Sequence, residues 1–183
     1  MFNAKKSICI KIGPDCKIPT KTVRIFETAI PWTTRAKHLG NWITSDLSDD
    51  ADISMKKSIF ISQVNTVNIK FGSVSSLIRG RLLQTYCCSW YGCQTWDAIG
   101  KGVEKVNIEW NKAVRRTLGI PCRTHRYLLP LLVKSKSFHE QHFSRLNKFI
   151  ATFMNSCNAH VSLIAKTCMF QNHGGTGAMC RLA

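Results

Sequence analysis

Length, composition and charge narrow the class of this protein. Its 183 residues, 44% of them hydrophobic, suffice for one domain with a buried core or for one domain and a small companion. No segment approaches the ~18 uninterrupted apolar residues of a membrane span, which excludes a transmembrane protein. The 26 Lys and Arg against 10 Asp and Glu give a net charge of +16, so a polyanion, and first of all nucleic acid, is the expected partner.

Short β-strands are predicted in the first fifty residues. Residues 8–12 and 22–26 are rich in β-branched side chains, and the turn formers Gly13 and Pro14 lie between them. A third strand is predicted over residues 37–43, in front of an acidic loop. The segment has the pattern of the edge of a sheet.

The spacing of apolar residues becomes helical after Asp52, which we expect to cap the first helix. The residues predicted to share its buried face are Ile59, Phe60, Val64, Val67 and Phe71. A second helix is predicted to follow Ser76 and to end near Gly92. Its inward side chains are predicted to be Leu82, Leu83, Tyr86 and Trp90.

The third predicted helix separates apolar from basic residues most clearly. At 100° per residue its apolar stripe comprises Val103, Val106, Trp110, Ala113, Val114 and Thr117. The opposite face gathers Lys101, Lys105, Lys112, Arg115 and Arg116. Gly119 and Pro121 are expected to end the helix, and Arg123, His125 and Arg126 follow it.

A fourth helix is predicted to start at Ser137, because Glu140 three residues later completes a capping-box pattern. Its apolar residues at helical spacing are Leu146, Phe149, Ile150 and Phe153. The fold class is therefore α+β, mainly α, with short strands followed by a helical bundle. We expect residues 1–50 to carry the strands, 51–128 the main helices, 129–170 the C-terminal helices and 171–183 a flexible tail.

The nine cysteines are an odd number and include the adjacent pair Cys87 and Cys88. The first residues contain lysines but no apolar segment typical of a secretory signal, so we expect a reducing compartment. The cysteines are accordingly interpreted as small buried hydrophobic side chains rather than as disulfides. The composition does not indicate whether the protein is localised in the nucleus or in the cytoplasm.

Several motifs in a fixed order resemble the reverse transcriptases of LINE-type (non-LTR) retrotransposons, in the part that follows the catalytic Asp-Asp motif. The motifs are the Asn3-Ala4-Lys5-Lys6-Ser7 turn, Lys37-His38-Leu39-Gly40, Ser89-Trp90-Tyr91-Gly92-Cys93-Gln94-Thr95-Trp96, and Leu118-Gly119-Ile120-Pro121. The resemblance covers about residues 1–155 and implies the last strands of a polymerase palm followed by a helical thumb.

The resemblance also implies roles for individual residues. Lys6 matches a lysine near the phosphates of the incoming nucleotide and is a candidate proton donor to the pyrophosphate leaving group. His38, Leu39 and Gly40 match the primer-grip hairpin, although histidine replaces the family's tyrosine. Lys101, Lys105, Lys112, Arg115, Arg116, Arg123 and Arg126 would follow an RNA–DNA or DNA duplex of template and primer.

Polymerase chemistry in this family needs Mg²⁺ ions held by clustered carboxylates. The pair Asp49-Asp50 lies after the primer-grip match and among polar neighbours, so we interpret it as the start of a helix. The resemblance therefore predicts a fragment that binds template and primer without polymerising, and Mg²⁺ is expected for the full parent enzyme.

Alternatives remain for most of these features. The basic residues also fit a solvated helix face, and Trp90, Tyr91, Trp96 and Trp110 fit a core better than base-stacking platforms. Cys157, His160, Cys168 and His173 have intervals reminiscent of a zinc knuckle, with a different ligand order. The chain as a whole could instead be a stand-alone basic nucleic-acid-binding helical module, or a decayed element with no cellular role.

Overall fold

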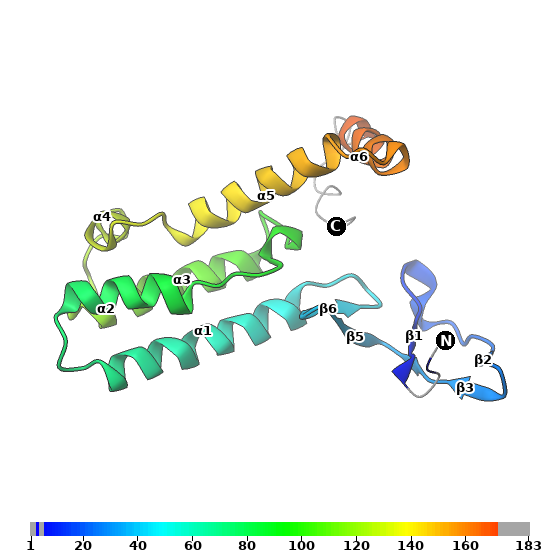
Figure 1. Ribbon diagram of the computed structural model, residues 1–183, viewed down its shortest axis with the longest axis horizontal. Coiled ribbons are helices and arrows are strands. Elements are labelled where there is room, and N and C mark those ends of the chain that lie inside the picture. Colours follow the sequence, from blue (N-terminus) through cyan, green and yellow to red (C-terminus); the bar gives the residue numbers. More distant parts are fainter. Residues whose placement is uncertain (1–2, 4–5, 172–183) are drawn as a thin grey trace. The chain divides into compact units, whose positions relative to one another are not determined.

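The computed structural model describes Asn3 and residues 6–171. Contacts divide the chain into two compact units, Met1–Asp52 and Ile53–Ala183. Helices predominate and the strands are short, so the fold is α+β, mainly α, as predicted (Figure 1). None of the described helices is long and apolar enough to cross a membrane.

The strands of the N-terminal unit form pairs rather than one sheet. In the described residues, β1 (Cys9–Ile10) is parallel to β4 (Trp32–Thr33), and β2 (Val23–Ile25) is antiparallel to β3 (Thr28–Ile30). A 3₁₀ turn, η2 (Pro14–Lys17), follows Gly13. The strand predicted over residues 8–12 is thus only two residues long, because the turn at Gly13 and Pro14 begins soon after it.

The single strand predicted over residues 37–43 is wrong, since the chain reverses in its middle. β5 (Arg35–His38) and β6 (Asn41–Thr44) form an antiparallel hairpin in which His38 pairs with Asn41. Leu39 and Gly40 make its two-residue turn with φ values of 47° and 86°. Turns of this kind need positive φ at both central positions, which glycine accepts readily and leucine seldom adopts.

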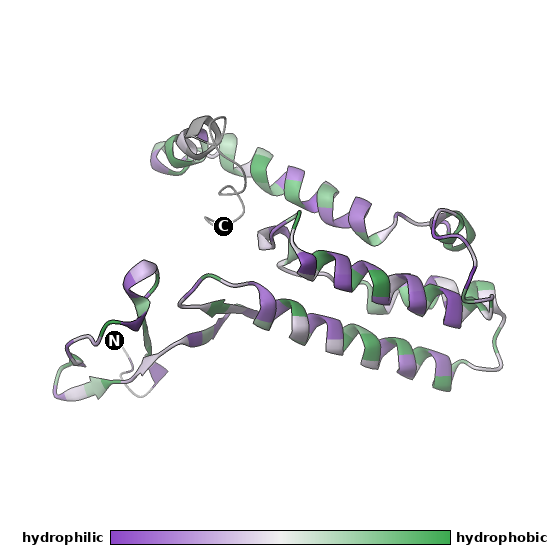
Figure 2. Cartoon of the chain, turned by 180° about the vertical axis from the view of Figure 1, so that it is seen from behind, coloured by the Kyte–Doolittle hydropathy of each residue, from purple (hydrophilic) through white to green (hydrophobic). Residues whose placement is uncertain are grey.

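The C-terminal unit is helical, with α3 between α1 and α5 (Figures 1 and 2). Its elements are α1 (Asp50–Lys70), α2 (Ser76–Leu82), the π turn η3 (Leu83–Cys87), the 3₁₀ turn η4 (Cys93–Thr95), α3 (Lys101–Leu118), α4 (Leu128–Val133), α5 (Phe138–Met154) and α6 (Ala159–Gln171). Besides α5, helix α3 packs on α2 and α4. Both hydrophilic and hydrophobic residues occur along α3 and α5, as expected of helices with one buried face (Figure 2).

Two predicted helix ends are wrong. Asp52 does not cap α1, which begins at Asp50, and its Oδ1 instead accepts a hydrogen bond of 3.0 Å from the Trp42 backbone N–H. The second helical segment ends at Cys87 instead of near Gly92, because Cys88 leaves helical geometry at φ −89° and ψ 33°. Trp90 therefore lies in the following loop.

The buried residues confirm the predicted face of α3 fully and the other predicted faces only in part. In α1, Phe60, Val64 and Val67 are buried, whereas Ile59 and, just past the helix end, Phe71 are exposed. On α5 the buried residues are Phe138 and His142, whereas the predicted Leu146, Phe149 and Ile150 are half-buried and Phe153 is exposed. Leu83 and Trp90 are buried and Tyr86 is exposed. The whole predicted apolar stripe of α3 is buried, and Asn107 joins it.

Three aromatic rings join α1 to α5 through the loop at Trp90. The ring centroids of Phe60 and Trp90 lie 4.8 Å apart, and those of Trp90 and Phe138 lie 4.8 Å apart in an edge-to-face arrangement. All three side chains are almost fully buried. Ring pairs of this geometry add to the stabilisation that burial itself provides.

We expect Phe60→Ala to lower the free energy of unfolding by about 3–5 kcal/mol, because it opens a cavity between α1 and Trp90. Phe71→Ala is the matched control, since Phe71 lies just past the end of the same helix and is 39% exposed. Chemical denaturation followed by circular dichroism measures both variants. An equal loss in the two variants would show that the Phe60–Trp90–Phe138 cluster is not a main source of stability.

Candidate nucleic-acid interface

Four cations form a stripe on the solvent side of α3. We call Lys101, Lys105, Lys112 and Arg116 the basic stripe; all four are exposed. At 3.6 residues per turn they fall within an arc of about 60°, opposite the buried face. The helix that presents them ends at Gly119, whose φ of 70° provides a left-handed C-cap with its N–H directed to the last carbonyls.

Few carboxylates neutralise the basic stripe. Lys112 Nζ lies 3.0 Å from Glu109 Oε1, an ion pair within the same helix. Arg116 donates a hydrogen bond of 2.9 Å from Nη2 to Asn65 Oδ1 on α1, a neutral partner. In the part of the chain that the structure describes, Lys101 and Lys105 have no carboxylate partner. The stripe is therefore an exposed row of positive charge that is only partly compensated.

Arg115 is half-buried and holds the loop that follows α3. Its Nε and Nη2 donate hydrogen bonds of 3.1 and 2.9 Å to the carbonyl oxygen of Thr124. This guanidinium, predicted from the sequence to contact nucleic acid, is thus engaged in positioning the loop. Both hydrogen bonds come from a charged donor, which makes them stronger than neutral ones.

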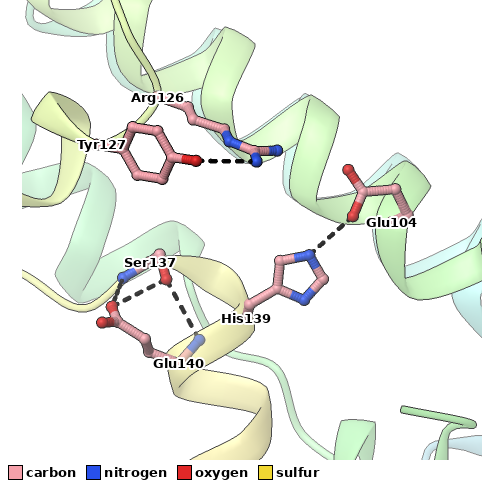
Figure 3. Close-up of polar contacts among 6 residues, drawn as sticks. All are labelled: Glu104, Arg126, Tyr127, Ser137, His139 and Glu140. Atoms are coloured by element: carbon pink, nitrogen blue, oxygen red, sulfur yellow. Dashed lines mark hydrogen bonds and ion pairs between the residues drawn. The ribbon is translucent and has the colours of Figure 1, made fainter. Parts of the chain in front are cut away.

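The loop that Arg115 anchors carries exposed cationic and aromatic side chains. Arg123 and Arg126 are exposed, as expected of contacts to a polyanion. The Arg126 guanidinium lies 5.2 Å from the centroid of the Tyr127 ring, and its Nη2 donates to Tyr127 Oη at 3.3 Å (Figure 3). This hydrogen bond lowers the pKa of Tyr127 and raises that of Arg126. The ring of His125 is nearly parallel to Tyr127, at 16° with 6.3 Å between centroids.

Tyr127 is a candidate contact residue that the sequence did not predict. Its only local signal is an aromatic residue between cationic neighbours in a loop, as in His125-Arg126-Tyr127. That pattern is common on protein surfaces, and what distinguishes this tyrosine is the position that Arg115 gives the loop.

Polar contacts link the start of α5 to α3. His139 Nε2 lies 2.8 Å from Glu104 Oε2 on α3 (Figure 3). Glu140 completes the predicted capping box: its Oε2 accepts from the Ser137 N–H at 2.7 Å, and the Ser137 hydroxyl accepts from the Glu140 N–H at 3.3 Å. These bonds with Ser137 lower the pKa of the Glu140 carboxyl.

A cavity of about 520 Å³ lies among α3, α4 and α5. Its polar lining consists of Asn107, Asn111, Arg126, Tyr127, His139 and Glu140, besides the cap residue Ser137. Pro130 and Leu131 of α4 supply the apolar lining. The cavity therefore combines an aromatic ring, two amides and an apolar wall.

His142 is buried on the inner side of α5. Its Nε2 lies 2.8 Å from the Cys93 carbonyl oxygen and must donate a proton to it, because a carbonyl only accepts. Its ring stacks on Phe138 at 12° with 6.0 Å between centroids. Burial lowers the pKa of His142, the bond to Cys93 opposes this effect, and the charge of His139 adds to it.

The cysteines follow the prediction only in part. Cys87, Cys88 and Cys93 are buried, and burial raises the pKa of Cys87 to about 11 and that of Cys88 to about 12. Cys122 and Cys157 are exposed, contrary to the expectation that the cysteines are buried. Both lie in connections between helices, where apolar burial is not required.

The structure gives no ligand geometry for the zinc-knuckle hypothesis. Among the described residues no three His, Cys, Asp or Glu side chains come together as metal ligands. Of the knuckle pattern, Cys157 follows α5 and His160 lies in the first turn of α6, whereas the side chain of Cys168 and the whole of His173 lie outside the described residues. In the acidic loop, Oδ1 of Asp46 and Oδ1 of Asp52 accept hydrogen bonds from nearby backbone N–H groups.

The residues matched to the polymerase palm lie in the N-terminal unit. Lys6 is exposed, and its backbone N–H donates to the Asn3 carbonyl at 3.0 Å, an oxygen that also accepts from the Ser7 hydroxyl at 2.9 Å. His38 and Leu39 are exposed at the tip of the β5–β6 hairpin, together with Gly40.

The aromatic residues confirm the core interpretation for Trp90, Trp96 and Trp110, which are buried. Tyr91 alone of that group is exposed.

Comparison with known proteins finds no relative: no family model, no curated protein and no solved structure matches the chain.

The lowered pKa of His142 makes stability depend on pH. Because the folded chain favours the neutral ring, the stability it contributes is present above the usual histidine pKa of ~6.5 and is lost as pH falls through the lower folded value. We expect the wild-type free energy of unfolding to fall between about pH 7 and about pH 5 more than that of His142→Phe. His160→Gln, at an exposed position, is the control and should keep the wild-type dependence. Equal pH dependence of His142→Phe and wild type would exclude a folded pKa below the unfolded one.

Proposed function

We propose that this chain is the part of a LINE-type reverse transcriptase that follows the catalytic carboxylates, and that its helical unit holds a duplex of template and primer. The observation that carries the proposal is the basic stripe of α3, exposed along the helix and only partly paired with carboxylates. The order of the sequence motifs supplies the link to the polymerase.

The dimensions of the stripe suit a duplex backbone. From Lys101 to Arg116 the helix rises about 22 Å at 1.5 Å per residue. One strand of a duplex passes about six phosphates over that length at about 3.4 Å each. Four cations can therefore each approach a different phosphate, and the exposed Arg123 and Arg126 extend the positive surface beyond the end of the helix.

The N-terminal unit has a separate role in this proposal. By its resemblance, the β5–β6 hairpin would support the primer end, with backbone approaching closely at Gly40, and Lys6 would give a proton to the departing pyrophosphate. Mg²⁺ would be held by carboxylates of the parent enzyme, since among the described residues of this chain no three His, Cys, Asp or Glu side chains come together as metal ligands. Alone, the chain binds and does not polymerise.

A stand-alone binding module is the second candidate, and the basic stripe supports it equally. The N-terminal unit favours the polymerase fragment. Ile8, Ile12, Ile18 and Phe26 are all exposed there, the last to 83%, and the strand pairs have open edges. Exposed apolar side chains beside unpaired strand edges are typical of surfaces that pack against further polypeptide.

Duplex binding is tested by removing charge from the stripe. The combined variant Lys101→Gln, Lys105→Gln, Lys112→Gln should bind a labelled RNA–DNA duplex at least about 10-fold more weakly at low salt, because three phosphate contacts are lost. The slope of log K against log salt, about −4 for the wild type, should shrink to about −1. Fluorescence anisotropy over a salt series measures both quantities.

The control for this experiment removes the same charge elsewhere. Lys70→Gln, Lys148→Gln, Lys166→Gln changes three exposed lysines outside the stripe. If this control weakens binding as much as the stripe variant does, attraction depends only on net charge and α3 is not the interface.

Polymerisation is tested directly. The purified chain, given a primed RNA template, deoxynucleotides and Mg²⁺, is expected to extend no primer, because the described residues bring no metal-binding carboxylates together. A complete reverse transcriptase under the same conditions is the positive control. Primer extension by this chain would overturn its assignment as a non-catalytic fragment.

A further inference from the structure

The cavity among α3, α4 and α5 is lined by none of the four residues of the basic stripe. Its volume of about 520 Å³ is in the range of small-ligand sites. On α3 the cavity is lined by Asn107 and Asn111. Around the helix axis, these two residues lie between the buried face and the basic stripe. A strand lying along the stripe therefore passes near the cavity.

Two amides of α3 offer hydrogen-bonding groups to the cavity. Asn107 is only 5% exposed overall and lines the cavity, and no described residue forms a hydrogen bond with its side chain. Its amide atoms are not among the fully buried unpaired polar atoms, so the donor and the acceptor are available to a ligand in the cavity. Asn111 lies one turn further along the same flank, as i,i+4 neighbours do. Each amide offers one acceptor and a donor group, the combination that pairs with the edge of a nucleobase.

The cavity also has an aromatic group suited to a base. Tyr127 is 69% exposed, and Arg126 contacts its ring and its hydroxyl. Tyrosine rings and arginine guanidinium planes are the surfaces on which unpaired bases stack. Arg115 fixes the loop that carries both residues through the Thr124 carbonyl.

The lining carries both signs of charge. Glu140 and Arg126 both line the cavity, and Glu104 lies 2.8 Å from His139, another lining residue (Figure 3). The Glu140 carboxylate can accept a hydrogen bond from an exocyclic amino group of a base, which a phosphate does not have.

We propose that this cavity binds one unpaired nucleobase of a strand whose backbone lies on the basic stripe. The base stacks against Tyr127 and pairs its edge with Asn107 and Asn111. This inference rests on the proposed duplex binding by α3. It gives the interface a preference for duplexes that carry a single-stranded end.

The test compares a blunt duplex with the same duplex carrying one unpaired 2-aminopurine at a 3′ end. The full chain should bind the overhang duplex about 10-fold more tightly than the blunt one and should quench its fluorescence by stacking. Tyr127→Ala should abolish both the preference and the quenching, and its affinity for the overhang duplex should fall to that for the blunt duplex. Tyr127→Phe keeps the ring and should keep the quenching.

Several outcomes would overturn the proposal. They are an absence of preference in the wild type, quenching that survives Tyr127→Ala, and an equal loss of affinity for both duplexes in that variant. Asn111→Ala should reduce the preference without changing the circular dichroism spectrum, which separates loss of the site from loss of the fold.

The base site can be tested even if the chain does not bind duplexes. If the chain binds neither duplex, 2-aminopurine riboside alone is titrated against wild type and Tyr127→Ala. Quenching by the wild type that the variant lacks supports the base site and shows that only duplex binding fails. No quenching by the wild type overturns the base site.

Discussion

The burial of one face of α3 is the constraint on which the helical unit depends. Trp110, Val106 and Val114 are fully buried within the core, and α2, α4 and α5 pack on this helix. When the apolar face of α3 is buried, the basic stripe must point to solvent, because the two lie on opposite sides of the helix. The basic stripe is therefore placed by packing, and its own charges contribute nothing to that placement. A substitution that disturbed the core would rotate or loosen the helix and displace all four cations together.

Features set by local periodicity could be predicted from the sequence, and those set by single backbone conformations could not. The buried face of α3 and the capping box of Ser137 and Glu140 follow from side-chain spacing over one or a few turns. The turn at Leu39 and Gly40 is indicated only by the resemblance to the primer-grip hairpin, because nothing in a β-rich segment marks a leucine with positive φ, and the glycine is equally compatible with a strand end. The π turn at η3 shows the same limit, since its apolar residues continue a helical pattern up to Trp90 while the backbone leaves it at Cys88.

In the candidate site, too, some residues could be predicted from their spacing and others could not. The cations of the stripe share one helix and were found from their spacing, whereas the cavity joins side chains from α3, the following loop, α4 and α5. Its links, such as the 2.8 Å contact between His139 and Glu104, span 35 positions in sequence, so no local pattern reveals them. Arg115 illustrates the difference most clearly. Its position on the helical wheel indicates a charged surface, and only the fold shows that its guanidinium is used by the Thr124 carbonyl.

The stripe itself lowers the stability of the helix that presents it. Lys101 and Lys105 are i,i+4 neighbours of like charge, as are Lys112 and Arg116, and each such pair costs about 0.2–0.5 kcal/mol. Two observed contacts reduce the cost: Glu109 pairs with Lys112, and Asn65 accepts from Arg116 without adding negative charge. Lys101 and Lys105, at the N-terminal end, also face the positive end of the helix dipole, which is the unfavourable end for cations. The packing of the core offsets this repulsion in the folded chain. A bound polyanion would reduce the repulsion and so stabilise the folded state, more strongly at higher occupancy.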